Sequence, residues 1–104
     1  MKTDSYLKSI FDEVNRKHFR NKLPPIRIRF KPDIGAADAR FVYERKRSWI
    51  NIGLWFTSEH RLINAVKHEI VHYWQWLKYR TYPKMDMMLN HTQEFKTIYE
   101  RINV

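Results

Sequence analysis

The segment from Leu62 to Leu77 constrains the fold more than any other part of the chain. Its apolar residues recur at spacings of three and four, the period of a helix with one buried face. These residues are Leu62, Ile63, Val66, Ile70, Tyr73 and Leu77. The same segment contains His68, Glu69 and His72 in the pattern H-E-x-x-H. Because residues four apart project from the same face of a helix, the two imidazoles can bind one metal ion with Glu69 beside them.

One further helix is predicted on each side of this central helix. From Ser5 to Phe19, and again from Phe95 to Ile102, large apolar side chains recur at helical spacing. The residues between Thr81 and Leu89 include Pro83 and predict a loop. We expect the three helices to begin near Thr3 or Asp4, after Thr57 or Ser58, and at Asn90, which forms a capping pair with Gln93.

Three short strands are predicted between the first two helices. Residues 26–30 alternate apolar and basic side chains, the two-residue period of a strand with one buried face. Two more strands, at residues 39–43 and 48–52, are joined by a charged tip at residues 44–47. The order of elements predicts an α+β fold in which a small antiparallel three-stranded sheet packs against the central helix. With 104 residues, of which 43% are hydrophobic, we expect a single domain over residues 1–104.

The charge of the chain favours polyanionic partners. Lys and Arg number 20 against 11 Asp and Glu, giving a formal net charge of +9. Nucleic acid binds such proteins through phosphate neutralisation and the release of counterions. Arg27, Arg29 and Lys31 alternate along the first strand, and Arg45, Lys46 and Arg47 follow at the charged tip. These six residues are candidate DNA contacts, although a solvated strand face explains them as well. Among the aromatic residues, Trp76 and Tyr79 are expected to be partly exposed and able to stack on bases.

Cysteine usage and the N-terminal sequence bear on the compartment. The chain has no Cys, so His and carboxylates must bind any metal. Residues 1–9 lack the apolar core of a signal peptide, and no apolar run approaches membrane-spanning length. We expect a monomeric, intracellular protein that is cytoplasmic or associated with the nucleoid or nucleus, with no membrane partner.

A hydrolytic zinc site needs a third protein ligand in addition to the two helix imidazoles. His91 is the best candidate, because a chain reversal after the central helix can bring it to the H-E-x-x-H face. Glu94 is the alternative ligand. Glu69 is better placed as the base that takes a proton from water than as a ligand.

The order of these motifs resembles a known family. An opening helix ends in the segment His18-Phe19-Arg20-Asn21-Lys22-Leu23-Pro24, a strand follows at residues 26–30, and the H-E-x-x-H helix precedes His91, Phe95 and Lys96. Over nearly its whole length the chain resembles the SprT-like zinc peptidases, which include the Spartan proteases acting on DNA–protein crosslinks. The resemblance implies a zincin-like domain with one Zn²⁺ bound by His68, His72 and His91, and with Glu69 as catalytic base. Thr92 departs from the pattern, since relatives usually have Gly at that position.

Two main functions follow as hypotheses. The first is a zinc-dependent endopeptidase acting on proteins associated with DNA, in which an exposed sheet edge at residues 49–52 could pair with extended substrate. The alternative is a basic nucleic-acid-binding module with a structural or catalytically silent zinc site, and a closed four-ligand site that includes Glu94 would favour it. A metal-dependent hydrolase acting on RNA or another non-protein substrate is a third, weaker interpretation.

Overall fold

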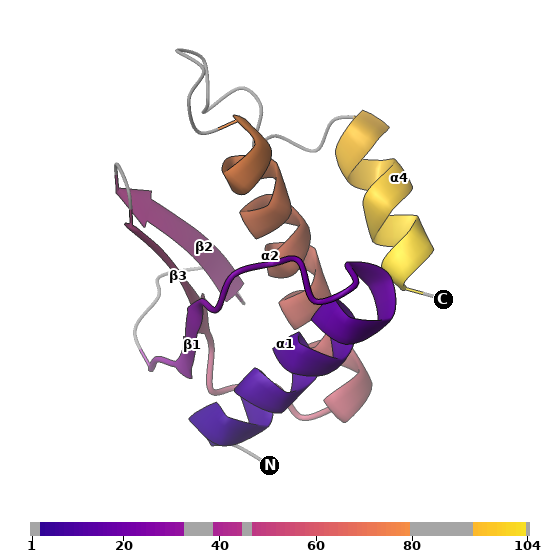
Figure 1. Cartoon of the computed structure of the whole chain (residues 1–104). Coiled ribbons are helices and arrows are strands. Elements are labelled where there is room, and N and C mark those ends of the chain that lie inside the picture. Colours follow the sequence, from indigo (N-terminus) through magenta and orange to yellow (C-terminus); the bar gives the residue numbers. More distant parts are fainter. Residues whose placement is uncertain (1–2, 33–38, 45–46, 80–92, 104) are drawn as a thin grey trace.

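The computed structural model describes residues 3–32, 39–44, 47–79 and 93–103. Within them the elements are α1 (Asp4–His18), β1 (Arg27–Phe30), β2 (Ala39–Glu44), β3 (Arg47–Ile52), α2 (Glu59–Tyr79) and α4 (Gln93–Ile102). Helix α2 lies between the sheet and α4, and α1 packs against β1 and α2 (Figure 1). The predicted α+β fold is confirmed.

The strands lie in the order β1-β3-β2, and their pairing is not all antiparallel as predicted. β2 pairs antiparallel with β3, but β1 pairs parallel with β3, from Arg27 opposite Trp49 to Phe30 opposite Ile52. The sheet is therefore mixed, because the chain passes from β1 to the far edge before it returns through the centre. As the central strand, β3 pairs on both sides, so the prediction that residues 49–52 form an exposed edge was wrong.

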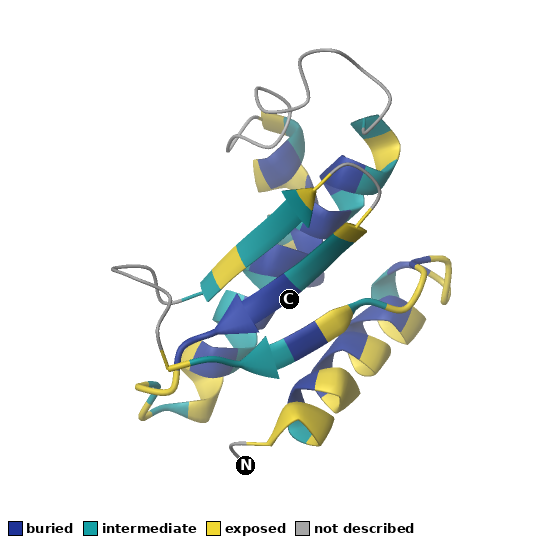
Figure 2. Cartoon of the chain, turned by 90° about the vertical axis from the view of Figure 1, so that its left-hand side faces the viewer, coloured by how far each residue is buried: buried dark blue, intermediate teal, exposed yellow. Residues whose placement is uncertain are grey.

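The two faces of the sheet have different environments. Ile28, Ile50 and Ile52 are buried on the face toward the helices, where the Phe41 ring packs against Tyr73 of α2. Side chains alternate between the two faces of a strand, so the intervening residues lie on the opposite face. Figure 2 shows this outer face, with its exposed positions on β1 and β2. All three helices described by the structure thus leave the outer face of the sheet uncovered.

The starts of α1 and α2 follow the predicted caps, whereas the third predicted cap, Asn90, lies outside the described residues. The Thr3 side chain accepts a hydrogen bond from the Tyr6 N–H at 3.1 Å, directly before α1. Ser58 precedes α2, and its hydroxyl accepts from the Arg61 N–H at 3.4 Å. Side-chain acceptors of this kind satisfy main-chain donors that have no partner within the first turn of a helix.

The turn after α1 is fixed by a buried asparagine. Asn15 Nδ2 donates to the Leu23 carbonyl at 2.9 Å, and the Leu23 N–H donates to Asn15 Oδ1 at 3.0 Å. Between them, Arg20 and Asn21 adopt left-handed backbone conformations, with φ of 54° and 59°. This conformation costs a non-glycine residue roughly 1–2 kcal/mol. The turn therefore persists because the surrounding contacts fix it, and Arg20 has a defined position at the surface.

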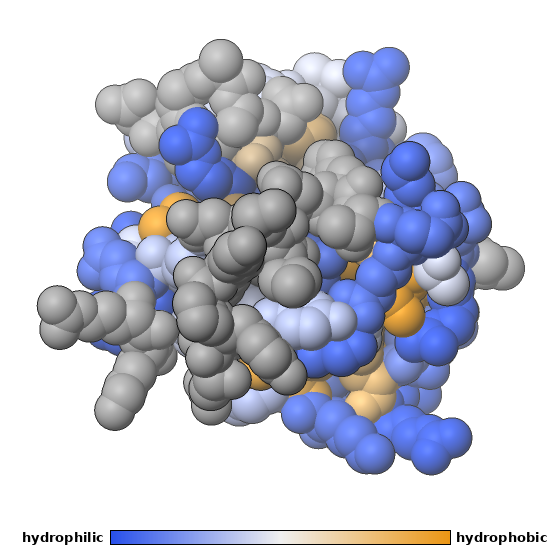
Figure 3. Space-filling view, turned by 90° about the horizontal axis from the view of Figure 1, so that it is seen from above, coloured by the Kyte–Doolittle hydropathy of each residue, from blue (hydrophilic) through white to orange (hydrophobic). Residues whose placement is uncertain are grey.

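The core lies between the helices and the sheet. The prediction that Trp76 is partly exposed was wrong. Trp76 is only 2% exposed and packs against Phe41, so it belongs to the core, whereas Trp55 is 44% exposed. Seen from above, most of the described surface is hydrophilic, with small apolar areas between (Figure 3). None of the described helices combines the length and apolar character needed to cross a bilayer. The fully buried aliphatic residues are Leu7, Ile50, Ile52, Val66, Ile70, Val71 and Ile102.

Candidate metal centre

The two histidines of the H-E-x-x-H pattern lie on one face of α2. Their ring centroids are 5.0 Å apart, and the potential ligand atoms of His68, Glu69 and His72 all lie within 4.8 Å of one another. The spacing of four residues places both rings on the side of the helix that faces β2 and α4. Among the residues described by the structure, these three side chains form the group that can bind a metal ion.

Glu69 is buried beside the two imidazoles, with 5% of its surface exposed. Burial raises the pKa of its carboxyl group from 4.5 to about 7, while a hydrogen bond from the Phe41 main chain and the charge of Arg40 act in the opposite direction. Burial dominates because a carboxylate loses hydration when it leaves water. A carboxyl group that titrates near neutral pH can both accept and return a proton under ordinary conditions.

Gln75 orients the His72 ring, a role that the sequence reading missed. Its side chain is fully buried, and Gln75 Oε1 lies 3.3 Å from His72 Nδ1. With the amide oxygen as acceptor, this contact corresponds to a proton on His72 Nδ1. The spacing of three residues on one helix is the signal that could have identified Gln75, because side chains three apart are neighbours.

Helix α4 forms one wall of the site. The Phe95 ring centroid lies 4.8 Å from that of His68 and 4.6 Å from that of His72, and the Tyr99 centroid lies 5.7 Å from that of His68. Close aromatic packing restricts the rotation of both imidazoles. A hollow of about 290 Å³ opens beside them, lined by Ala39, Asn64, Ala65, His68, Glu69 and Tyr99.

Strand β2 forms the opposite wall and is an edge of the sheet. The Phe41 main chain donates a hydrogen bond to Glu69, so its N–H points away from β3. The direction of main-chain N–H and C=O groups alternates along an antiparallel strand. Those of Ala39 and Tyr43 therefore also point away from β3, as the Phe41 N–H does. Of the described strands, β2 is therefore the edge strand that lies beside Glu69, whereas β3 is central.

The two residues proposed as further ligands have different outcomes. His91 lies outside the described residues, so its role as third ligand stays a prediction. The Glu94 carboxylate accepts hydrogen bonds from Lys78 Nζ at 2.7 Å and from the Tyr79 hydroxyl at 2.9 Å. Glu94 is not a member of the group formed by His68, Glu69 and His72.

Comparison with known proteins identifies the family. The SprT-like family model matches residues 7–104, which include every described helix and strand of the site. The chain belongs to the SprT-like family. No curated protein matches the sequence. The SprT-like match and the H-E-x-x-H geometry together indicate a zinc metallopeptidase-like domain.

The outer sheet face of this SprT-like chain brings some of the predicted basic residues together. Arg27 and Arg29 on β1 share that face with Arg47 and Trp49 on β3, according to the strand register. Arg47 Cζ lies 6.0 Å from the Trp49 ring centroid. The register also adds Arg40 of β2, which the sequence reading missed because its face depends on pairing. Lys31 follows the end of β1, and Arg45 and Lys46 lie outside the described residues.

Proposed function

We propose that this SprT-like chain is a zinc-dependent endopeptidase in which His68, His72 and His91 bind the ion and Glu69 acts as the general base. The observation that carries the proposal is the buried Glu69 carboxyl group next to two imidazoles on one helix face, with the potential ligand atoms of the three side chains within 4.8 Å of one another. Burying a titratable carboxyl group lowers the stability of the folded state. Its position beside two potential metal ligands is instead suited to proton transfer.

The ligand set is compatible with zinc. Neutral imidazole nitrogen is a preferred zinc ligand at about 2.0–2.1 Å. The potential ligand atoms of His68, Glu69 and His72 lie within 4.8 Å of one another, close enough to share one ion. Gln75 Oε1, 3.3 Å from His72 Nδ1, would orient the ring for binding the ion through its other nitrogen. A zinc ion in this position would lower the pKa of a nearby water molecule and polarise a substrate carbonyl.

Glu69 supplies the acid–base chemistry. Its carboxylate would accept a proton from the attacking water and return it to the leaving amine nitrogen. The Phe41 N–H stabilises the ionised form, and burial favours the protonated form, so both states are accessible in one catalytic cycle.

The edge of β2 suits an extended peptide. Ala39 and Tyr43 present main-chain groups on the same side as Glu69, so a substrate strand paired there would pass beside the base. Main-chain pairing recognises few side chains, which favours a broad range of protein substrates.

We also propose that the substrates are proteins bound to DNA. Support comes from the net charge of +9 and from the outer sheet face, which Trp49 shares with Arg27, Arg29, Arg40 and Arg47. Arginines bind phosphates and an indole can stack on an unpaired base, so this face suits single-stranded DNA. The same face supports the alternative function, a nucleic-acid-binding module with a silent metal site.

Three variants and one assay test the proposal. Purified protein is analysed for zinc and incubated with a DNA-binding protein as substrate, with and without single-stranded DNA. Glu69→Gln should retain zinc and lose hydrolysis, whereas His72→Ala should lose both. Glu100→Gln, which makes the same chemical change at an exposed position of α4, should behave as wild type.

The two functions give different results in this assay. Substantial hydrolysis by Glu69→Gln would refute the role of the base. Zinc and DNA binding without cleavage, in wild type and Glu69→Gln alike, would support the binding module instead.

A further inference from the structure

A second cleft lies on the side of α2 away from the metal centre. Trp74 follows His72 by two residues, so their side chains leave the helix about 200° apart. The cleft has a volume of about 580 Å³ and is lined by the end of α1, the turn after it, α2 and α4. Small-molecule sites have volumes of roughly 300–1,000 Å³, so a ligand larger than a single ion fits here.

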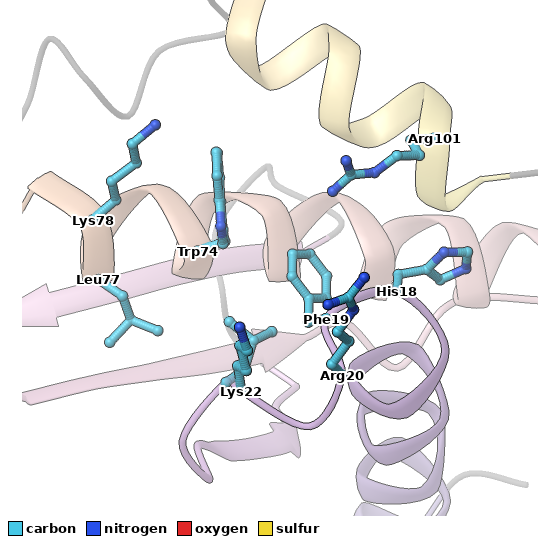
Figure 4. A pocket seen from close by; sticks show the side chains of 9 residues that line it. His18, Phe19, Arg20, Lys22, Trp74, Leu77, Lys78 and Arg101 are labelled. Atoms are coloured by element: carbon cyan, nitrogen blue, oxygen red, sulfur yellow. The ribbon is translucent and has the colours of Figure 1, made fainter.

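Positive side chains from the turn after α1 and from α4 line this cleft. Arg20 and Lys22 come from the turn after α1, and Arg101 comes from α4 (Figure 4). None of the three forms an ion pair with any residue in the described part of the chain. Lys78, also in the lining, is paired with Glu94 at 2.7 Å. No carboxylate of the described residues lines the cleft.

Gathering three cations that lack an acidic partner is unfavourable unless an anion binds between them. The positive environment also affects His18 in the cleft wall, whose pKa is lowered by burial first and then by neighbouring charges that include Arg101. The Asn15–Leu23 hydrogen bonds hold the turn that presents Arg20 and Lys22. These cations are therefore prepositioned, which reduces the entropy that an anionic ligand must overcome on binding.

Aromatic side chains complete the cleft. Trp74 is partly exposed, and Lys78 Nζ lies 5.0 Å from its ring centroid, while the Phe19 ring lies deeper, between Trp74 and Arg20 in Figure 4. Guanidinium groups bind phosphate oxygens in pairs, and an indole surface stacks on planar rings. Inorganic phosphate uses the cations alone, and an aliphatic phosphate ester gains little from Trp74.

We propose that this cleft is a nucleotide-binding site, in which Arg20, Lys22 and Arg101 bind the phosphate and Trp74 stacks on the base. The nucleotide is either free in solution or one unit of a single strand. The site is separate from the H-E-x-x-H centre and from the outer sheet face, and it does not depend on peptidase activity.

Nuclear magnetic resonance distinguishes this cleft from other tryptophan environments. The four indole N–H signals are assigned with single Trp→Phe variants, and the protein is titrated with deoxyadenosine monophosphate, deoxyadenosine or inorganic phosphate. The mononucleotide should shift the Trp74 signal, and the other two probes should bind at least about 10-fold more weakly. Equal binding of inorganic phosphate and the mononucleotide would contradict the stacking role of Trp74.

Matched charge variants test the phosphate contacts. Arg20→Gln and Arg101→Gln should each weaken binding by about 10-fold. Arg61→Gln, which removes the same charge from an exposed position at the start of α2, should leave it unchanged. Circular dichroism confirms that each variant is folded. Equal affinities for all three variants would overturn the proposal.

A short oligodeoxyadenylate separates the two sources of the nucleotide. If the mononucleotide binds as tightly as the oligonucleotide, the ligand is a free nucleotide. If only the oligonucleotide shifts the Trp74 signal, and Arg20→Gln reduces that shift, the ligand is part of a strand. If neither compound affects the Trp74 signal at millimolar concentration, the cleft is not a nucleotide site.

Discussion

Gln75 places a fully buried amide next to one ring nitrogen of His72. We expect Gln75→Met, which keeps the volume and removes the acceptor, to lower zinc affinity by about 10–100-fold. Gln75→Glu retains an acceptor and should bind zinc more tightly than Gln75→Met. Competition with a chromophoric chelator measures both affinities, and thermal unfolding checks that the variants fold. Wild-type affinity in Gln75→Met would show that Gln75 does not position the ring.

His18 makes stability depend on pH. Burial lowers its pKa, and the charges of Lys17, Lys67 and Arg101, on three different helices, lower it further, while Glu13 opposes them. The folded protein therefore binds a proton at His18 less readily than the unfolded chain, whose histidine pKa is about 6.5. The stabilising contribution is present above that value and is lost as the pH falls through the lower folded-state pKa.

Replacing His18 by Gln should remove this dependence. Between pH 7.5 and 5, wild type should lose more unfolding free energy than His18→Gln does, as measured by urea denaturation at several pH values. His60→Gln, at an exposed position of α2, is the matched control and should follow wild type. Parallel stability curves for wild type and His18→Gln would contradict the expected proton linkage.

Single residues differ in how far their roles follow from sequence. The H-E-x-x-H spacing predicts that His68 and His72 converge, because the helical period is local information. Arg40 was missed because the face of a strand residue depends on which strand it pairs with. The partner of β1 could not be predicted for the same reason, since alternation indicates a buried face but not a neighbour.

At the scale of elements, β2 combines two roles, since it forms one wall of the candidate metal centre and is an edge strand among the described strands. If substrate pairs with this edge, N-methylation of a peptide substrate at alternate residues should raise KM by more than about 10-fold, because those N–H groups donate to β2. Methylation at the intervening residues, whose N–H groups point away, should have little effect on KM. Steady-state kinetics on the two peptide series measure the difference, and equal effects would refute strand pairing.

The helices were predictable as elements for a physical reason. Thr3 and Ser58 cap main-chain donors locally, and apolar residues recur at the helical period, so the starts of α1 and α2 follow from short segments. The parallel pairing of β1 with β3 joins residues 22 positions apart, from Arg27 to Trp49, and no local pattern encodes it.

For the whole molecule, the net charge of +9 governs encounters with polyanions. Binding to single-stranded DNA should weaken with salt, and removing one phosphate contact should reduce the slope of log affinity against log salt by about 0.7. Arg27→Gln and Arg40→Gln on the outer sheet face should each have this effect, as fluorescence anisotropy at several salt concentrations can show. Arg16→Gln, where the arginine pairs with Glu13 at 2.7 Å on α1, should not change the slope. A uniform response of all three variants would place the DNA elsewhere.

Helix α2 carries His72 on one side and Trp74 on the other. Two residues only two positions apart would thus serve different sites, and a screen for proteolysis alone would detect substitutions at position 72 but not at position 74. Neighbours in the sequence of α2 therefore need not share a function. Variants of this helix need to be classified by the direction in which each side chain leaves the helix axis.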